Sequence, residues 1–376
     1  MNEKFRIALY MPSLQGGGGE RVMSSLANGL VDMGSKVDFL LAEKKGSFLT
    51  DLKEQVHICD LGAKSTFGSI PALVRFIRRE RPHVLISALE HANLCALIAR
   101  LFFGSQTKLI VTVHVAPSRW VLSVGWKDRL VAGLNRWLYR LADGVVAVSQ
   151  GVAEDLKKNY WVRKDRVKVI YNPVIGNKLW KQMSEPSQAI TGLDGEKYII
   201  AVGNMVGHKD YPTLLKAFAL MKDDGAFKLL ILGDGPQRAA LEQQIIELGL
   251  QGRVLLPGFV SNPYALIKKA QVYVLSSDWE ALPTVVIEAL AAGVAIVSTN
   301  CEYGPDEILK GGKYGVLVPV ANPKALAEAL RNVLKKGSVS YDPLEATVRF
   351  RIESASKEYF ELSQMLTGSN RDGSKG

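Results

Sequence analysis

The chain has 376 residues and a mass of 41.2 kDa, which is enough for two domains that each bury their own core. Its hydrophobic content of 47% and charged content of 22% are typical of a globular protein. No apolar run is long enough for a membrane span or a signal peptide, so a cytoplasmic location is expected. The cysteines Cys59, Cys95 and Cys301 form no CxxC motif, which favours buried free thiols over a disulfide or a structural zinc site.

The net charge of +10 is unevenly distributed. Residues 1–172 hold 25 Lys and Arg against 15 Asp and Glu, whereas the remaining residues hold 22 of each kind. A basic half beside a neutral half indicates two surfaces with different partners. An anionic membrane and a nucleic acid are the usual partners of a basic surface.

Predicted strands and helices alternate through the first half. The strands are expected at residues 6–11, 37–41, 56–61, 83–87, 108–114, 144–148 and 166–171, and the helices at 20–33, 69–79, 92–103 and 150–159. This alternation predicts a doubly wound, mostly parallel α/β sheet, in which ligands bind beyond the carboxyl ends of the strands. His114 ends one of these strands. It is therefore a candidate site residue, although a structural role fits the pattern equally well.

A glycine-rich turn, Gly16 to Gly19, follows the first strand. Glycines let a backbone pass close to a ligand because they have no Cβ atom. The turn is not a convincing dinucleotide fingerprint, since no acidic residue ends the next strand at residues 37–41. A flexible loop without a ligand remains the alternative.

The segment Ser118 to Leu141 differs from its surroundings because it mixes tryptophans with arginines and lysines at helical spacing. Such a helix suits the headgroup layer of a bilayer, where the aromatic rings are buried and the cations meet anionic lipid. A helix that packs on the core with a solvated basic face is the alternative.

A second alternating set follows a polar, irregular linker at residues 177–196. It predicts a second doubly wound domain. The domains are expected at 1–172 and 173–342, followed by a C-terminal helix at 343–367 that crosses back to the first domain and a disordered tail at 368–376. Strands are expected at 197–203, 227–232, 253–256, 272–275, 294–298 and 315–318, and helices at 212–221, 237–248, 263–269, 305–310 and 323–335.

The stretch Ser276 to Gly293 (SSDWEALPTVVIEALAAG) predicts a strand end, a sharp loop and a helix that begins near Pro283. Glu280 lies in the loop and Glu288 lies just over one turn into the helix. Its angular position predicts that Glu288 faces away from the buried stripe of the helix. A helix N-terminus suits phosphate, and flanking carboxylates suit sugar hydroxyls. The alternative is that both glutamates are ordinary solvated charges.

Taken together, the two doubly wound domains, the glycine-rich turn and the E-x7-E helix resemble the retaining glycosyltransferases of family four, which have the GT-B fold. The resemblance covers essentially the whole chain. It implies two Rossmann-like domains that face a cleft, with the acceptor in the first and a nucleotide-sugar donor in the second. The run Gly304 to Ile308 (GPDEI) resembles a branch that builds bacterial polysaccharides and lipid-linked oligosaccharides.

The resemblance also implies roles for individual residues of the second domain. Glu280 would hold hydroxyls of the donor sugar, Glu288 would hold the ribose, and Lys209 would bind the diphosphate. Asn204 stands where the family has an arginine, so the charge clamp is weaker, because Asn lacks the charged bidentate fork. The remaining donor-binding candidates are the turn glycine Gly233, the base-facing Gly258, and the helix start at Leu282, Pro283 and Thr284.

In the first domain the resemblance assigns His114 to the donor sugar in the reaction zone, and Gly17 and Gly18 to the loop near the donor phosphate. The implied reaction is transfer of a hexose or N-acetylhexosamine, with retained configuration, from a UDP-linked donor rather than a GDP-linked one. No D-x-D pair is present, so metal independence is expected, and no cofactor beyond the donor is expected.

The resemblance further implies a glycan or lipid-linked acceptor. Together with the basic, tryptophan-bearing segment Ser118 to Leu141, such an acceptor predicts peripheral binding to the inner face of the cell membrane. Two alternatives remain. One is another enzyme on the same scaffold, a sugar-nucleotide epimerase or a phosphorylase. The other is a basic nucleic-acid-binding protein, which the absence of a reader motif disfavours, so no nucleic acid partner is expected.

Overall fold

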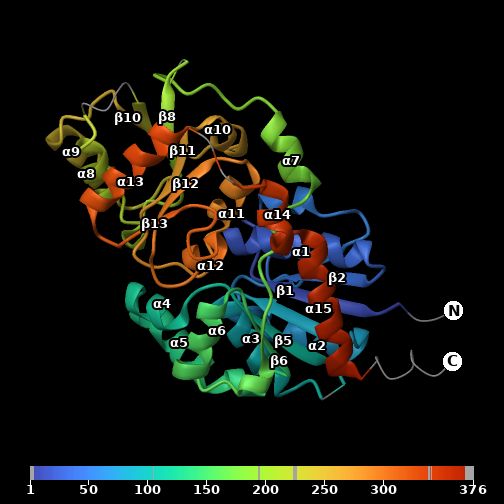
Figure 1. Cartoon of the computed structure of the whole chain (residues 1–376). Coiled ribbons are helices and arrows are strands. Elements are labelled where there is room, and N and C mark those ends of the chain that lie inside the picture. The colour runs from blue at the N-terminus through green and yellow to red at the C-terminus, as the bar shows by residue number, and fades with distance from the viewer. Residues whose placement is uncertain are drawn as a thin grey trace. The chain divides into compact units, whose positions relative to one another are not determined.

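The computed structural model describes residues 4–104, 106–193, 195–222, 227–337, 339 and 341–368. The chain divides into two compact units (Figure 1). Unit 1 contains residues 1–174 and the segment from Phe350 onward, and unit 2 contains Ile175–Arg349. The C-terminal helix therefore belongs to the same unit as the N-terminal half, and each unit is a parallel α/β sheet, as the sequence predicted.

The sheet of unit 1 has, among the described residues, seven parallel strands in the order β3-β2-β1-β4-β5-β6-β7. Its central strands are buried on both faces, which explains why they are continuous apolar runs rather than alternating ones. The strands are β1 (Arg6–Met11), β2 (Lys36–Leu41), β3 (His57–Asp60), β4 (Val84–Ala88), β5 (Lys108–Val113), β6 (Gly144–Ala147) and β7 (Val167–Val169).

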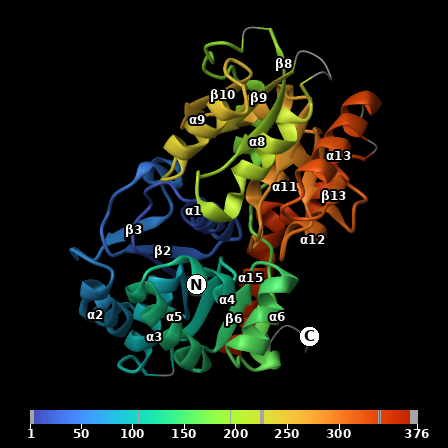
Figure 2. The same ribbon diagram turned by 90° about the vertical axis from the view of Figure 1, so that its left-hand side faces the viewer.

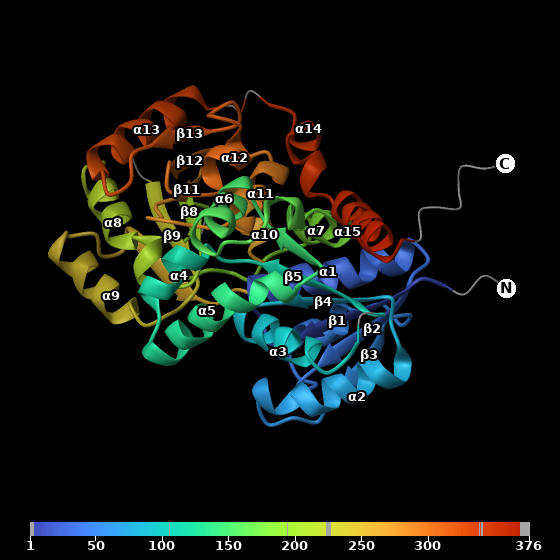
Figure 3. The same cartoon turned by 90° about the horizontal axis from the view of Figure 1, so that it is seen from below.

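Helices cover both faces of this sheet. Figure 3 shows α1 and α15 on one side of it, and α2 and α3 on the other. The helices are α1 (Gly18–Asp32), α2 (Ile70–Glu80), α3 (Glu90–Arg100), α4 (Pro117–Ser123), α5 (Trp126–Leu138), α6 (Gln150–Asn159) and α15 (Ile352–Thr367), with short 3₁₀ turns η1 (Ser47–Asp51), η2 (Phe67–Ser69), η3 (Tyr139–Leu141) and η4 (Lys164–Arg166). Tyr359 of α15 is buried, and its hydroxyl lies 3.3 Å from Thr112 Oγ1 on β5.

The sheet of unit 2 has, within the described part of the chain, six parallel strands in the order β10-β9-β8-β11-β12-β13. The strands are β8 (Lys197–Val202), β9 (Phe227–Leu232), β10 (Val254–Gly258), β11 (Val272–Leu275), β12 (Ala295–Thr299) and β13 (Val316–Val318). Successive strands run outward in one direction from β8 and in the other from β11. The order therefore reverses between these two neighbours.

The helices α8, α9 and α13 pack on one face of this sheet and form a core cluster with it, whereas α10, α11 and α12 lie on the other face (Figure 1). Leu214, Leu241 and Leu330 are buried members of that cluster. The helices of unit 2 are α7 (Asn177–Ser184), α8 (Tyr211–Ala219), α9 (Arg238–Glu247), α10 (Tyr264–Lys269), α11 (Thr284–Ala291), α12 (Pro305–Leu309), α13 (Pro323–Lys336) and α14 (Pro343–Thr347), with 3₁₀ turns η5 (Gly207–Lys209) and η6 (Val348–Phe350).

Two sequence predictions about the connections were wrong. The polar linker contains α7, because Leu179 and Met183 lie four residues apart and bury one face of a short helix that packs on α10. The single C-terminal helix is instead two helices, α14 and α15, because Arg351 has extended backbone and interrupts them. The predicted disordered tail lies outside the described residues apart from Gly368, whose left-handed conformation ends α15.

Candidate active site

Unit 2 places two loops side by side at the point where its strand order reverses. One loop follows β8 and the other follows β11, and both leave the carboxyl end of the sheet. In open α/β sheets this is where ligands bind, because the chain diverges to opposite faces and leaves a crevice. Most of the donor-site residues that were predicted from the sequence lie on these two loops or beside them.

Lys209 and Glu280 connect the two loops directly. Lys209 Nζ lies 2.6 Å from Glu280 Oε1, and Ser277 Oγ donates to the same carboxylate oxygen at 2.8 Å. Ser276 Oγ donates to the Lys209 carbonyl oxygen at 2.8 Å, which fixes the backbone of the lysine. Both charged side chains are largely buried, with exposed fractions of 16% and 10%. The lysine is thus a positioned cation that can stabilise anionic oxygens, and the carboxylate can accept hydroxyl hydrogen bonds.

His208 and Trp279 are a second link between the loops, and no sequence motif indicated either residue. Their rings stack with centroids 4.4 Å apart, and the Asp278 amide donates to the His208 carbonyl oxygen at 2.8 Å. Burial lowers the pKa of His208. Each residue directly precedes a predicted site residue, and that adjacency is the signal by which the pair could have been found.

Glycines hold the neighbouring strand ends close together. Gly233 directly follows β9 and has φ +125°, and a Cβ atom there would lie 2.2 Å from the Gly203 carbonyl oxygen. Its amide donates to the carbonyl oxygen of Gly258 at 2.9 Å, which connects β9 to β10. A side chain at position 235 is excluded in the same way, since a Cβ atom added to Gly235 would lie 2.6 Å from the Met205 carbonyl oxygen. Asn204, at the position where an arginine was expected, is exposed in this loop.

The start of α11 is packed against the loop that follows β12. Pro283 is the N-cap residue of α11, preceded by Leu282 and followed by Thr284. A Cβ at Gly304 would lie 2.5 Å from Pro283 Cδ, so the backbone of the Gly304 turn presses on the proline. Glu280 also donates its amide to the Glu302 carbonyl oxygen at 3.0 Å. The loop between β11 and α11 is therefore supported from two sides.

The prediction that Glu288 faces away from the buried side of its helix was wrong. Glu288 is only 2% exposed. The helix α11 is covered by α10, α12 and α14 as well as by the sheet, so it has no solvated face at that position. A periodicity argument from one helix cannot reveal this, because it does not show how many neighbours the helix has.

Tyr273 on β11 lies beside this buried acidic region. Its side chain is fully buried, and its hydroxyl oxygen has no hydrogen-bond partner within the described residues. Burial raises the pKa of Tyr273, and the nearby Tyr211, Glu280 and Glu288 raise it further. Burial and Glu280 likewise raise the pKa of the Cys301 thiol to about 12. The Tyr273 hydroxyl and the Cys301 thiol therefore stay neutral at physiological pH.

Unit 1 contains the other predicted residues. His114 follows β5, and its Nε2 atom is buried without a hydrogen-bond partner among the residues that the structure describes. Burial lowers the pKa of His114 to about 4, while a side-chain hydrogen bond with Asn172 opposes that shift. The imidazole is therefore neutral near pH 7. A neutral ring with one unused nitrogen can donate to or accept from a ligand hydroxyl.

The glycine-rich turn begins α1 rather than forming a separate loop. Gly17 is the N-cap residue and Gly18 is the first residue of α1. The carboxylate of Glu20 lies over the turn, because a Cβ at Gly17 would be 2.2 Å from Glu20 Oε2. The turn follows β1. From β1 the strand order runs to β2 and β3 on one side, and from its neighbour β4 it runs to β5, β6 and β7 on the other side. The turn therefore lies at the point where the strand order of unit 1 reverses.

The tryptophan-rich segment packs on the core with one face and exposes large apolar side chains on another. It forms α4 and α5, which pack on each other (Figure 2). Val131 and Ala132 on one face of α5 are buried. The other face is apolar and exposed, through Trp126, Leu130, Leu134 and Trp137 at spacings of three and four residues.

Basic side chains accompany this exposed face. Arg136 lies 3.9 Å from the ring centroid of Trp161, whose ring packs edge-on against Trp137 at 5.2 Å. Lys127 lies 5.6 Å from the ring centroid of Trp126. Among the described residues, no helix is both long enough and apolar enough to cross a bilayer.

Two family descriptions match this chain. Residues 16–175 match "Glycosyltransferase Family 4", and residues 184–349 match "Glycosyl transferases group 1". The two matches follow one another and correspond closely to the two units. The chain therefore belongs to the glycosyltransferases of the GT-B fold, which confirms the family resemblance drawn from its motifs.

Individual proteins agree with this assignment. A Campylobacter jejuni enzyme named N-acetylgalactosamine-N,N'-diacetylbacillosaminyl-diphospho-undecaprenol 4-alpha-N-acetylgalactosaminyltransferase is 28% identical over 344 residues, covering 88% of this chain and 90% of its own. A second C. jejuni alpha-1,4-N-acetyl-D-galactosaminyltransferase, named for a PP-undecaprenol saccharide, is 28% identical over 339 residues, covering 88% and 89%. An Anabaena protein crystallised with UDP and glucose shares the fold, with a TM-score of 0.77, 19% identity, and coverage of 95% and 98%.

Proposed function

We propose that this glycosyltransferase moves a hexose or N-acetylhexosamine from a UDP-linked donor to a hydroxyl of a lipid-linked saccharide, with retention of configuration and without a metal ion. The Lys209–Glu280 pair at the reversal point of unit 2 is the observation that carries the proposal. It offers one positioned cation for a diphosphate and one carboxylate for sugar hydroxyls. The relatives named for undecaprenol-linked acceptors support the choice of acceptor.

The diphosphate of the donor would lie beside Lys209 and the amide groups of the loop after β8. Asn204 brings no charge to this loop, so Lys209 and the polar backbone would carry the stabilisation of the leaving group. Glu280 would accept hydrogen bonds from the sugar, and Glu288 from the ribose. No carboxylate of the site was predicted to attack the anomeric carbon as a nucleophile. The acceptor would therefore attack on the face from which the diphosphate leaves, and the leaving phosphate would itself take the acceptor proton.

The exposed apolar face of α5 would bring the enzyme to its lipid-linked acceptor. Trp126 and Trp137 can enter the headgroup layer, while Lys127, Arg136 and Arg140 meet anionic lipid. The enzyme would then act peripherally on the inner face of the membrane. The excess basic charge of residues 1–172 supports that placement.

A transfer assay tests the proposal. The chain is incubated with UDP-linked N-acetylgalactosamine, N-acetylglucosamine, galactose or glucose, each with a synthetic polyprenyl-diphosphate saccharide. We expect one donor to yield an extended acceptor with an α-linkage, by NMR of the product, and equal rates before and after EDTA treatment. A β-linked product would contradict retention, and a rate that requires added Mg²⁺ or Mn²⁺ would contradict metal independence.

A second measurement separates this function from its alternatives. Turnover of the sugar nucleotide without any acceptor, to an epimer or a free sugar, would contradict the transfer reaction. Transfer from a GDP-linked donor rather than a UDP-linked donor would contradict only the proposed base. Thermal shift with UDP and GDP distinguishes these, because a ligand that binds the folded chain raises its melting temperature.

A further inference from the structure

Three potential metal ligands converge on one face of the sheet in unit 1. Asp38 on β2 pairs in parallel register with His57 on β3, and Cys59 follows two residues later on the same strand. Because side chains alternate along a strand and register partners share a face, all three side chains point to the same side. The sequence could not show this group, because its members come from two strands. The spacing of residues along the sequence does not reveal the register in which those strands pair.

The donor atoms are close enough to share one ion. His57 Nδ1 lies 2.9 Å from Asp38 Oδ1 and 3.3 Å from Cys59 Sγ. All three donor atoms lie within 4.8 Å of one another. A tetrahedral zinc site, with bonds of about 2.0–2.3 Å, separates neighbouring ligand atoms by about 3.3–3.7 Å. Small rotations of the side chains would therefore satisfy the geometry.

We propose that Asp38, His57 and Cys59 form a binding site for Zn²⁺. One thiolate, one imidazole and one carboxylate are the ligand types that zinc prefers, and the sulfur disfavours magnesium and calcium, which take oxygen ligands. The fourth coordination position opens into the adjacent pocket. This inference is independent of the proposed transfer reaction, which uses Lys209 and Glu280 in unit 2.

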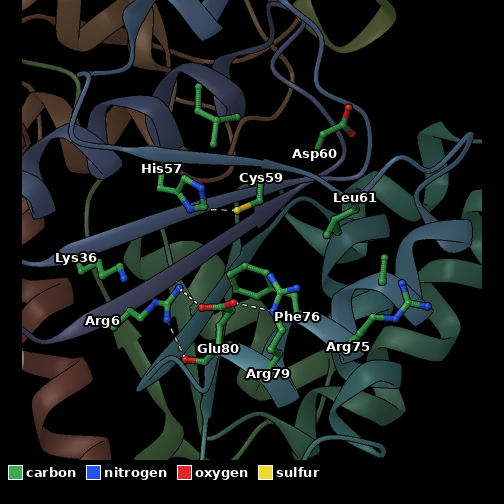
Figure 4. A pocket seen from close by; sticks show the side chains of 12 residues that line it. Arg6, Lys36, His57, Cys59, Asp60, Leu61, Arg75, Phe76, Arg79 and Glu80 are labelled. Carbon is green, nitrogen blue, oxygen red and sulfur yellow. Dashed lines mark hydrogen bonds and ion pairs between the residues drawn. The ribbon is translucent and has the colours of Figure 1, made fainter.

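The pocket that adjoins the cluster gives an ion access from solvent. It has a volume of about 700 Å³ and is lined by residues of β1, β3 and α2. Figure 4 shows His57 and Cys59 next to each other along one wall, with Arg6, Glu80 and Arg79 connected across the pocket. The His57 side chain is 66% exposed, whereas Asp38 is fully buried behind it. An ion could therefore enter without unfolding of the sheet.

The charges around the cluster are compatible with a divalent cation despite the nearby arginine. Arg6 Nε lies 2.6 Å from Asp38 Oδ2, which leaves Oδ1 for the metal. The second side of the Arg6 guanidinium is paired with Glu80 at 2.8 Å. A thiolate and a carboxylate neutralise the two charges of Zn²⁺, and the Glu80 carboxylate is shared between Arg6 and Arg79. Because Lys36 and Arg75 also line the pocket, the ion depends on its two anionic ligands for charge balance.

A bound ion would connect an edge strand to its neighbour. β3 pairs only with β2 in the described sheet, and two of the three ligands lie on β3. Zinc would therefore connect β3 to β2 through metal–ligand bonds, in addition to the backbone hydrogen bonds between these strands. We expect zinc to raise the melting temperature of the full chain and to leave the transfer rate unchanged.

Metal binding to the intact chain tests the proposal. After dialysis against EDTA and then buffer, equilibrium dialysis should give one tightly bound Zn²⁺ per chain. Co²⁺ should bind competitively and give a thiolate-to-cobalt charge-transfer band, which reports a sulfur ligand directly. Cys59→Ser should abolish this band, and both Cys59→Ser and His57→Ala should weaken zinc binding at least about 10-fold.

Matched controls show whether the loss is specific. Asp60→Asn alters a carboxylate of the same pocket that is bonded to backbone amides, and it should keep zinc affinity and the cobalt band. Circular dichroism and melting temperature of each metal-free variant show whether it folds. The site would be overturned if the unaltered chain bound no zinc, if Cys59→Ser kept the band and the affinity, or if Asp60→Asn lost binding equally. Stabilisation by inorganic phosphate but not by zinc would also overturn it, and would assign the pocket to an anion at Lys36 and Arg75.

Discussion

The ammonium of Lys209 lies 2.6 Å from the carboxylate of Glu280, across the two loops where the strand order of unit 2 reverses. Each charge offsets the cost of burying the other, because both side chains are largely buried and an isolated buried charge is costly. The pair also aligns backbone segments from two neighbouring strands.

Replacing Glu280 by glutamine should affect transfer more than donor binding. Gln keeps an oxygen that can accept from Lys209 and Ser277, so the loops should retain their structure. It loses the charge that strengthens hydrogen bonds to sugar hydroxyls. We expect turnover to fall by about 100-fold or more, while the dissociation constant of the donor changes by less than about 3-fold. Initial rates and isothermal titration of the donor measure the two effects.

Replacing Glu288 by glutamine should do the opposite. We expect donor affinity to fall about 10-fold, equivalent to about 1.4 kcal/mol, with turnover at saturating donor nearly unchanged. Titration with UDP alone isolates the nucleotide contribution. Glu328→Gln, an exposed change on α13, is the matched control and should alter neither quantity. Equal loss of turnover in Glu280→Gln and Glu288→Gln would contradict their separate roles.

Alanine at Gly233 should destabilise unit 2 and weaken donor binding. The residue has φ +125°, and the new Cβ would lie 2.2 Å from the Gly203 carbonyl oxygen. We expect a loss of about 2 kcal/mol or more in the free energy of unfolding, measured by urea denaturation. Gly207→Ala in the neighbouring loop is the control, because its Cβ would meet nothing closer than 3.8 Å. Similar urea midpoints for the two variants would show that the close approach of β8 and β9 is not required.

His114 should make unit 1 less stable in mild acid. Its folded pKa of about 4 lies below the unfolded value of about 6.5. Between these values the unfolded chain binds a proton that the folded chain does not, so stability falls as the pH is lowered from about 6.5 toward 4. At about pH 5 this costs about 2 kcal/mol relative to about pH 7.5. His114→Gln should remove that part of the pH dependence in urea denaturation, and an unchanged pH dependence would refute the assignment.

Membrane binding should depend on the exposed face of α5. The double variant Trp126→Ser and Trp137→Ser should lose flotation with anionic vesicles, because burying each large apolar side chain contributes about 1.5–3 kcal/mol. Binding of the unaltered chain should weaken as salt rises. Ile246→Ser, which removes an exposed apolar side chain of α9 in unit 2, is the control and should float normally. Flotation of the double variant with neutral and anionic vesicles alike would assign binding to another surface.

Much of the fold could be predicted from the sequence because its strands are short apolar runs that alternate with amphipathic helices. β1 and β9 have the predicted bounds, since local composition alone defines a strand that is covered on both faces. The short helix α7 was missed because its apolar residues, Leu179 and Met183, form less than two turns of pattern. A pattern that short does not distinguish a helix from a linker.

The candidate site was predictable only in part, for a different reason. Lys209 and Glu280 could be named from motifs, but the contact between them needs the pairing of β8 with β11, which is long-range. The stacking of His208 on Trp279 depends on the same pairing. The burial of Glu288 depends on how many helices surround α11. Neither kind of information is contained in the period of one segment.

The return of α15 to unit 1 has a consequence for how the protein is made. Tyr359 packs in the core beside α1 and reaches Thr112, 247 residues earlier in the chain. During synthesis, the part of α1 that α15 covers therefore stays exposed until all of unit 2 has been translated. Unit 2 is continuous in sequence and can close as soon as it leaves the ribosome. The half that is synthesised first is thus completed only after the other half has been translated.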